Sequence, residues 1–474
     1  MTLDLSAIAD DLLLRAPSRV ALIDPDGTWT FGEFRDAVLA ATARLRAAGV
    51  AAGDRVLIVD EPSRVSLVSV FAALRLGATA MPTNPRLTRA EINTLIELTG
   101  VGPAVIAGRQ FQDRVADLER LVIGAEIIAP FNGDAAAEPA PGQDALLLFT
   151  SGTTGLPKPV PVPWQTLTAR LAPYADAPAT QVRMLCLPIH HVGGLLGAMV
   201  SIIGGHSLVV MPRFDASDWL RLVEEHRVQM LFIVPTMLSR IVDHPDCATT
   251  DLSSLETITY GASPMTDDLI QRLTAAMPNV GLVNTFGQTE TLGGITLSTP
   301  EDAVHPVHRT SVGKLVPGVQ IRIVTPGTED ELPVGTTGEL LVQSGQNVVD
   351  GWIRTGDLVR LDADGYLYPE GRLSDTINRG GEKFGPVEVE TALRTHPLVT
   401  DCAVAGVPDP ELNERVGAVV VVSEPVDVAE LQTWCAERIA KYKTPELVVF
   451  ADEVPLTDMS KVDRKAVVRI IQEG

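Results

Sequence analysis

Short apolar runs alternate with helix-forming stretches along most of this 474-residue chain. Runs such as 55–59 and 104–107 are mostly apolar, which predicts strands that are buried on both faces of a sheet. The stretches 64–76 and 267–276 have the length and composition of helices. This alternation predicts an α/β fold of layered, mostly parallel sheets. We predict further strands at 79–81, 145–149, 184–187, 207–211, 230–234 and 257–260, and a further helix at 217–226.

The pattern changes in the last third of the chain. Residues 320–324 and 338–342 predict short antiparallel strands separated by Pro/Gly turns. We place a domain boundary near 371–375. Residues 1–372 then form a large domain of layered α/β subdomains plus a small β-barrel-like part, and residues 373–474 form a small α+β domain. In the small domain we predict helices at 386–395 and 428–440 and strands at 399–407 and 416–422.

The chain is strongly acidic, with a formal net charge of −22 and a pI of about 4.8. This charge argues against nonspecific binding to nucleic acid or to anionic membranes. The apolar stretch 193–211 contains glycines and His206, so we predict a buried helix followed by a strand and no membrane span. The acidic N-terminus lacks the basic start of a secretory signal. Nothing in the pattern specifies an oligomeric state.

The cysteines are few and lie far apart, without a Cys-x-x-Cys pair. Their spacing predicts neither a zinc site nor a disulfide framework. Reduced, buried thiols are typical of a cytoplasmic protein, which is the location we expect. The four residues are Cys186, Cys247, Cys402 and Cys435.

The segment 149–159, Phe-Thr-Ser-Gly-Thr-Thr-Gly-Leu-Pro-Lys-Pro, directly follows an apolar run. Backbone N–H groups, hydroxyls and one lysine on a flexible turn are the groups that bind a polyphosphate. The segment differs from a Walker A loop because Pro157 separates Gly155 from Lys158. For this segment alone, an ordinary Ser/Thr/Gly linker is the alternative.

Two later segments offer carboxylates next to small residues. Thr-Phe-Gly-Gln-Thr-Glu at 285–290 ends in Glu290, and a carboxylate beside a triphosphate is a ligand for Mg²⁺. Arg-Thr-Gly-Asp at 354–357 ends in Asp357, which is suited to accept hydrogen bonds from the two hydroxyls of a ribose. Taken alone, each segment is also compatible with a solvated loop or turn.

Three further segments combine glycine with charge. Arg372, in Gly-Arg-Leu-Ser-Asp at 371–375, either binds phosphate or ribose or joins the domains. The two glycines in Asn-Arg-Gly-Gly-Glu-Lys at 378–383 allow a ligand to approach the backbone closely, or form a hairpin turn. The segment 455–465 carries Lys461 on a polar loop, where a lysine is usually only a solvated charge.

Together these segments resemble the adenylate-forming superfamily of acyl-CoA synthetases, nonribosomal adenylation domains and luciferases. The resemblance covers nearly the whole chain, and the motifs follow the family's order. They are FTSGTTGLPK at 149–158, LPIHHVGG at 187–194, FGQTE at 286–290, GEL at 338–340, RTGD at 354–357, GRLSDTINRGGEKFGPVEVE at 371–390, and KYKTP with SKVDRK at 441–465. The resemblance implies that ATP, Mg²⁺ and coenzyme A are used and that residues 373–474 form a mobile lid domain.

The resemblance also implies roles in nucleotide binding and catalysis. Thr289 would contact the α-phosphate, Glu290 would bind Mg²⁺, and Lys461 would bridge the substrate carboxylate and the α-phosphate. Asp357 would take the ribose hydroxyls, with Arg372 beside it. The remaining ATP-binding residues that it implies are Thr150, Ser151, Gly152, Thr153, Thr154, Gly155, Lys158, Asn284, Thr285 and Phe286.

For the acid and the thiol, the resemblance implies a pocket, a tunnel and a hinge. His191 matches the residue that gates the acyl pocket, Gly380 and Gly381 would line the pantetheine tunnel, and Ser374 falls at the hinge. The other predicted pocket residues are Val192, Gly261, Ala262, Gly287 and Gly293. Because the pocket segments are apolar or small, we expect an apolar aryl or medium-length alkyl acid. His190 or His191 could pair with a second polar group on it.

Four positions depart from the family pattern. Pro159 replaces the usual glycine after Lys158, the lysine of the predicted phosphate-binding segment. Phe286 replaces the usual tyrosine. Ser374 replaces the usual Asp or Lys at the hinge, and His190 stands where an aromatic or aliphatic residue is usual. None of these changes removes an essential charge, so we expect an active enzyme.

The predicted activity is an ATP-dependent carboxylic acid–CoA ligase that works through an acyl-adenylate. One alternative is a free-standing adenylating enzyme that loads an acyl or β-amino acyl group onto a carrier protein. The others are a nucleotide-binding scaffold without catalysis and a luciferase-type oxidative enzyme. Retention of Lys461, Glu290 and Asp357 argues against the scaffold.

Overall fold

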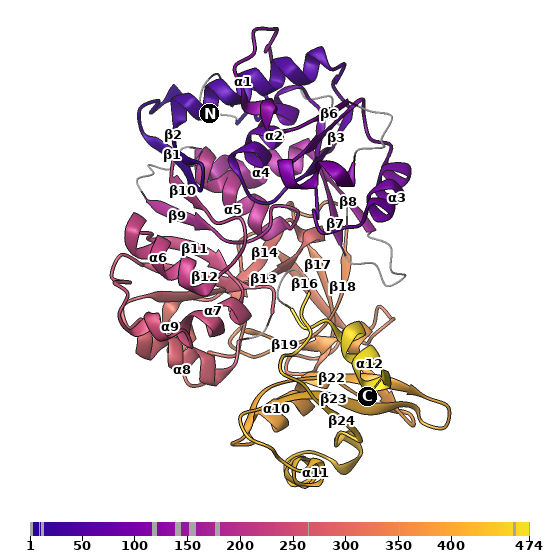
Figure 1. The fold of residues 1–474 in the computed structure, drawn as a ribbon. Helices are drawn as coiled ribbons and strands as arrows, with labels where there is room; N and C mark the ends of the chain where they lie inside the picture. The colour runs from indigo at the N-terminus through magenta and orange to yellow at the C-terminus, as the bar shows by residue number, and fades with distance from the viewer. Residues whose placement is uncertain are drawn as a thin grey trace. The chain divides into compact units, whose positions relative to one another are not determined.

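The computed structural model (Figure 1) divides into two compact units. Unit 1 comprises Met1–Arg309, Val316–Val319 and Ser344–Gly351, and unit 2 comprises Thr310–Leu315, Gln320–Gln343 and Trp352–Gly474. The boundary predicted at 372/373 stays a prediction, because packing in one structure does not show about which residue a lid turns. The structure describes the whole chain except residues 1–2, 9, 11–13, 116–120, 138–143, 151–157, 176–180, 264, 350, 458–460 and 474.

Unit 1 contains two mostly parallel sheets, as the alternation predicted. The first has the strand order β6-β5-β3-β4-β7-β8, and only β8 at its edge runs antiparallel to its neighbour. The parallel strands β3 (Arg55–Val59), β4 (Thr79–Thr83), β5 (Ala104–Ala107) and β7 (Asp144–Thr150) are mostly apolar runs that are largely buried on both faces. Strand β6 (Leu121–Ile123) is also parallel to its neighbour, and the antiparallel edge strand is β8 (Lys158–Pro163).

The second sheet of unit 1 runs in the order β14-β13-β12-β11-β9-β10-β1-β2. Its central strands are parallel, and the antiparallel partners β14 and β2 lie toward its ends. The strands are β1 (Val20–Asp24), β2 (Gly27–Thr30), β9 (Val182–Leu185), β10 (Ser207–Val210), β11 (Met230–Ile233), β12 (Thr257–Gly261), β13 (Gly281–Gln288) and β14 (Gly293–Leu297).

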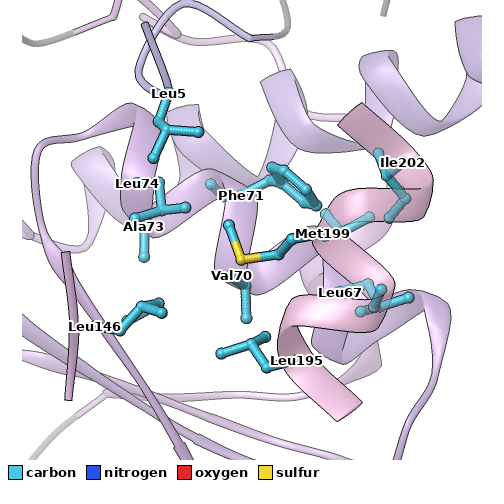
Figure 2. Close-up of a cluster of buried hydrophobic side chains, with 14 of the residues drawn as sticks. Leu5, Leu67, Val70, Phe71, Ala73, Leu74, Leu146, Leu195, Met199 and Ile202 are labelled. Carbon is cyan, nitrogen blue, oxygen red and sulfur yellow. The ribbon is translucent and has the colours of Figure 1, made fainter. Parts of the chain in front are cut away.

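Helices cover both faces of these sheets. Alternate residues of β3 point to opposite sides, so Val56 and Ile58 join a core with the first helices, while Leu57 and Val59 join a second core with α3. In the first core, Leu195, Met199 and Ile202 of α5 pack against α2 (Figure 2). The helices are α1 (Phe31–Ala47), α2 (Arg64–Arg75), α3 (Arg89–Thr99), α4 (Trp164–Ala175), α5 (Val192–Ile203), α6 (Ala216–His226), α7 (Pro235–Val242), α8 (Asp267–Ala276) and α9 (Pro300–Val304).

Every residue of α2 is buried, including the arginines at its two ends. Arg64 donates from Nε to Asp24 at 2.8 Å and lies over the Trp29 ring at 4.5 Å, while Arg75 donates from Nη1 to Asp10 at 2.7 Å. A charged side chain in a protein interior needs such a partner to offset its lost hydration. The two ion pairs therefore allow an otherwise apolar helix to begin and end inside the protein.

Replacing Asp24 by alanine is expected to lower the free energy of unfolding of unit 1 by about 3–5 kcal/mol, because it leaves Arg64 buried without a carboxylate. Urea unfolding followed by circular dichroism measures the change. The control is Glu225→Ala, which removes an exposed ion pair with Arg221 on α6 and should cost less than about 1 kcal/mol. Equal, small losses in both variants would show that the Asp24–Arg64 pair does not stabilise the fold.

Unit 2 contains two sheets. The first is antiparallel, in the order β16-β17-β18-β19, and the second has the order β21-β20-β23-β22 with β24 beside β23. Helices α10 and α12 pack on β22 and contribute to two separate cores. The elements are β16 (Gln320–Val324), β17 (Gly338–Gln343), β18 (Ile353–Leu361), β19 (Leu367–Arg372), β20 (Ile377–Arg379), β21 (Glu382–Phe384), α10 (Pro386–Arg394), β22 (Val399–Asp409), β23 (Asn413–Val422), α11 (Val428–Ala436), β24 (Leu447–Phe450) and α12 (Arg464–Glu473).

Several predicted bounds were wrong. The helix predicted at 428–440 ends at Ala436, because the chain then turns to the short 3₁₀ helix Lys441–Lys443 and to β24, which pairs with β23. The strand predicted at 184–187 ends at Leu185, where it leaves the sheet. The stretch 193–211 forms α5 and β10, as predicted. Among the described residues, no helix is long and apolar enough to cross a membrane.

Candidate functional site

The predicted pocket and catalytic residues of unit 1 gather at one edge of the second sheet. Strands β9, β11, β12 and β13 are parallel neighbours, so their carboxyl ends lie at the same edge. His191 follows β9, Gly261 and Ala262 end β12, and Thr289 follows β13. The carboxyl edge of a parallel sheet is where α/β proteins bind ligands. The topology thus brings together residues that are far apart in sequence.

Two glycines at this edge are required by close backbone approach. A Cβ atom added to Gly261 would lie 2.2 Å from the carbonyl oxygen of Thr285, and one added to Gly287 would lie 2.0 Å from that of Gly293. Such separations are impossible for a side chain. Ala262, with φ of 70°, adopts the left-handed conformation that non-glycine residues rarely take. The close approach of backbone segments at this edge therefore requires glycine at positions 261 and 287.

Asn284 supports the strands from inside. Its side chain is buried and forms a hydrogen bond with the hydroxyl of Tyr260. Tyr260 is the residue opposite Asn284 on β12. Burial raises the pKa of Tyr260 to about 12, which keeps this phenol neutral. The backbone N–H of Asn284 also donates to Ser298 Oγ at 2.7 Å. The structure therefore gives Asn284 a structural role, and its contact with ATP stays a prediction.

Thr289 and Glu290 lie on a single turn that is fixed by its neighbour Thr291. The Thr291 hydroxyl accepts a hydrogen bond from the Gln288 N–H at 3.1 Å and can donate to the Gly293 carbonyl at 2.8 Å. The Glu290 carbonyl oxygen accepts from the Val348 N–H at 3.0 Å. Among the described residues, the Glu290 carboxylate has no hydrogen-bond or ion-pair partner. The turn is therefore held in place while its carboxylate oxygens remain available.

This arrangement fits Mg²⁺. The ion is held in nucleotide sites by one or two carboxylates, with phosphate oxygens and water as the other ligands. Glu290 supplies one carboxylate on a fixed turn. Among the described residues there is no group of three or more His, Cys, Asp or Glu side chains able to hold a metal alone. A cation at Glu290 would therefore depend on the oxygens of a bound phosphate.

The predicted phosphate cradle connects two paired strands. Thr150 ends β7 and Lys158 begins β8, and the two residues are directly opposite each other in the antiparallel ladder. Lys158 is exposed. The residues between them, Ser151, Gly152, Thr153, Thr154 and Gly155, lie outside the described residues. Their role as a cradle stays a prediction.

In unit 2, Asp357 and Arg372 form an ion pair. They are opposite each other on β18 and β19, and Arg372 Nε donates to Asp357 Oδ1 at 2.6 Å. The Asp357 side chain is 9% exposed and the Arg372 side chain 52% exposed. The sequence placed Arg372 beside Asp357 by family resemblance, and the contact is present. The pair combines a fixed acceptor with an exposed cation, which suits hydroxyl and phosphate groups.

Gly380 and Gly381 form the two-residue turn between β20 and β21. Their φ values are 59° and 96°, both in the left-handed region that favours glycine in such hairpins. No atom lies within 4 Å of the position that a Cβ on Gly381 would take. The hairpin is therefore confirmed, and its backbone is open to a ligand. The CoA tunnel itself stays a prediction.

Lys461 lies three residues before the start of α12. Its N–H donates to Thr457 Oγ1 at 3.3 Å, and the Thr457 N–H donates to the Lys461 carbonyl at 2.7 Å. The helix that follows is anchored by Arg464, which donates to Glu390 at 2.6 Å and to Asp375 at 3.2 Å. These carboxylates raise the pKa of Arg464 despite its burial. Lys461 therefore lies shortly before a helix whose first residue, Arg464, is fixed by two carboxylates.

The predicted hinge is connected to the same anchor. Ser374 Oγ donates to Asp375 Oδ1 at 2.8 Å, and the other oxygen of Asp375 accepts from Arg464. Ser374 lies in the 3₁₀ turn Leu373–Asp375, between β19 and β20. Its role as a pivot stays a prediction.

Sequence reasoning did not single out Arg170, which the structure places next to Gly293. Arg170 lies on α4, whose buried side chains include Leu167 and Leu171. The sequence did contain a signal for this residue. Arg170 follows Leu167 by three positions and directly precedes Leu171, which puts a charge at the margin of the apolar face of the helix.

Comparisons with known proteins cover most of the chain. A family model described as AMP-binding enzyme matches residues 12–352, and one described as AMP-binding enzyme C-terminal domain matches residues 388–461. The chain is 32% identical over 493 residues to an indoleacetate–CoA ligase of Aromatoleum aromaticum, covering 96% of each chain. It is 32% identical over 461 residues to a feruloyl-CoA synthase of an Amycolatopsis species, covering 91% of this chain and 92% of that one.

A solved structure is similar over almost the full length. The o-succinylbenzoate CoA synthetase of Bacillus subtilis, in complex with its acyl-adenylate intermediate, superposes with a TM-score of 0.84 at 28% identity. The match covers 98% of this chain and 97% of that one. Both sheets of unit 1 and the sheets of unit 2 therefore have counterparts in an adenylate-forming enzyme.

Proposed function

The chain belongs to the AMP-binding enzyme family, and we propose that it is an ATP-dependent carboxylic acid–CoA ligase that forms an acyl-adenylate. The observation that carries the proposal is the fixed turn after β13, which presents Thr289 and Glu290 at the carboxyl edge of a parallel sheet, with no described residue bound to the Glu290 carboxylate. A carboxylate on such an edge suits a metal-bound nucleotide. The names of the similar proteins, which are CoA ligases or synthases, support CoA as the thiol.

In the first step, an oxygen of the substrate carboxylate attacks the α-phosphorus of ATP. The bond from the α-phosphorus to the bridging oxygen breaks, and pyrophosphate leaves with the electron pair. No general base is needed, because the acid is already ionised at pH 7. Both reactants are anionic, so we assign Lys461 to the α-phosphate and the substrate carboxylate, and Thr289 to a hydrogen bond with the α-phosphate. Mg²⁺ held by Glu290 would withdraw charge from the phosphate oxygens.

In the second step, a thiol sulfur attacks the acyl carbon, AMP leaves with its oxygen, and the thiol proton is released. The thiol does not come from this chain. All four cysteines are free and buried, and burial raises the pKa of Cys186 and Cys402 to about 12 and that of Cys435 to about 11. Buried neutral thiols are poor nucleophiles. An external thiol is therefore required, and reduced cysteines fit the cytoplasmic location that we propose.

The second candidate is loading of a carrier protein. It uses the same first step and differs only in the molecule that carries the accepting thiol. In both cases the thiol stands at the end of a pantetheine arm. The open backbone at Gly381 suits either form of the arm. The names of the relatives favour free CoA.

The test is pyrophosphate release with ATP and Mg²⁺ against alkyl, aryl, dicarboxylic and β-amino acids, with and without CoA. We expect sustained turnover only with CoA, together with an acyl-CoA thioester detected by mass spectrometry. Acid-dependent pyrophosphate exchange that is indifferent to CoA would favour the carrier-protein alternative. No exchange and no release with any acid would contradict ligase activity.

A further inference from the structure

Arg170 is a half-buried cation that has no acceptor among the residues that the structure describes. Its Nε atom is fully buried and makes no hydrogen bond. Among the described residues, its guanidinium has no hydrogen bond, ion pair or ring contact. By contrast, Arg64, Arg75 and Arg464 are each paired with a carboxylate. In a chain with a net charge of −22, an unpaired arginine inside a unit is a specific feature of that site.

The guanidinium lies against the backbone that follows the Thr289–Glu290 turn. A Cβ on Gly293 would be 3.5 Å from Nη2 of Arg170, 3.6 Å from its Nε and 3.6 Å from Cδ1 of Leu196. Gly293 has a φ of 110°, so glycine is required there and no side chain fills the space. Gly293 was predicted to line the acyl pocket. Arg170 therefore contributes a positive charge to the wall at that position.

A second donor without an acceptor belongs to the residue opposite Gly293 in the sheet. Gln288 is opposite Gly293 in the β13–β14 ladder, and its buried side-chain nitrogen makes no hydrogen bond. Buried polar groups in folded proteins are almost always paired, and each unpaired one costs about 1–3 kcal/mol. Two such donors, one beside Gly293 and one on the residue opposite it in the ladder, indicate that the missing acceptor belongs to a ligand.

The chemistry of the guanidinium identifies the kind of acceptor. Arginine presents its N–H groups in a planar fork that matches the two oxygens of a carboxylate. Leu196, whose Cδ1 is 3.6 Å from the same Cβ position, is apolar. A ligand here would therefore combine an apolar body with one anionic group.

We propose that Arg170 is a specificity-determining residue that selects acids carrying a second carboxylate besides the one that reacts. This inference rests on the proposed ligase function and refines its substrate class. The expected apolar aryl or alkyl acid becomes an apolar diacid, whose second carboxylate pairs with Arg170. We assign Arg170 to the choice of acid and not to the use of ATP.

The experiment compares matched acids that differ only in the second carboxylate. The pairs are adipate with hexanoate, and 3-(2-carboxyphenyl)propanoate with 3-phenylpropanoate. For each acid, kcat/KM is measured by pyrophosphate release with the wild type, Arg170→Met and Arg170→Lys. Gln165→Met, an exposed position on the same helix, is the control.

We expect Arg170→Met to lower the diacid-to-monoacid ratio of kcat/KM about 30-fold or more, because it removes one partner of a desolvated charge pair. Arg170→Lys keeps the charge but loses the fork, so its ratio should be intermediate. The KM for ATP should stay the same in all variants, and Gln165→Met should leave the ratio unchanged. A ratio that Arg170→Met leaves unchanged would overturn the proposal while the ligase function stands.

Equilibrium binding separates this inference from the proposed function. If no acid is turned over, ligase activity fails, but adipate binding can still be measured as a shift in Tm. A rise in Tm that the wild type and Gln165→Met show and Arg170→Met lacks would retain Arg170 as a carboxylate site. Equal shifts in all three proteins, or no shift in any of them, would overturn it. Circular dichroism of Arg170→Met and Arg170→Lys checks that both variants fold.

Discussion

Replacing Lys461 by alanine is expected to lower the rate of acyl-adenylate formation by ~10²–10³, because a well-placed cation no longer offsets the charge on the α-phosphate in the transition state. Formation of the thioester from supplied acyl-adenylate should be nearly unchanged, because no charge on ATP is then involved. Acid-dependent pyrophosphate exchange measures the first step, and acyl-CoA production from the synthetic acyl-adenylate measures the second.

Lys465 provides the matched control for this experiment. It is exposed on α12, four residues further along the chain, and Lys465→Ala should leave both steps intact. The loop that carries Lys461 is held by Thr457 and by the Arg464 anchor, so the alanine variant should fold normally. If Lys461→Ala slowed both steps equally, the lysine would not be specific to adenylation.

Replacing Glu290 by glutamine is expected to slow adenylation by about 10²-fold and to raise the Mg²⁺ concentration needed for half-maximal rate by about 10–100-fold. The substitution keeps the shape of the side chain but removes its charge. The turn itself should survive, because Thr291 and the Val348 N–H hold it through contacts that do not involve the Glu290 carboxylate. The rate of pyrophosphate release measured across a Mg²⁺ titration provides both numbers.

Glu301→Gln is the control for the metal assignment, since Glu301 is exposed at the start of α9. It should leave the Mg²⁺ dependence unchanged. A Glu290→Gln variant with the wild-type rate and the wild-type Mg²⁺ requirement would remove Glu290 from the metal site. The thermal stability of both variants should match that of the wild type.

The local pattern was sufficient to predict elements whose burial follows a regular sequence pattern. Strand β3 and helix α8 have the predicted bounds, because a continuous apolar run and an amphipathic period are both properties of neighbouring residues. The end of α11 was missed because it depends on where β24 must pair with β23, and that pairing joins residues far apart in the chain. The bounds of β23 were missed for a similar reason, since its polar start at Asn413 pairs with Asp409.

The candidate site shows the same division. The motif order predicted the residues, and the topology brings several of them to one sheet edge. The adjacency of Asp357 and Arg372 was also expected. The sequence could not predict that Asn284 is buried against Tyr260, because this depends on strand register. Nor could it predict that no described residue accepts a hydrogen bond from Arg170 Nε, because the position of possible acceptors is a property of packing.

The Asp375–Arg464 ion pair limits where the polypeptide can act as a pivot. Because Arg464 is also bound to Glu390 and to the Val404 carbonyl, Asp375 is attached to the same rigid body as α12 and the Lys461 loop. Any swivel about Ser374 would therefore use the backbone torsions between Arg372 and Asp375 and would carry Asp375 along. The ion pair would then couple a rotation about a few backbone bonds directly to the position of Lys461.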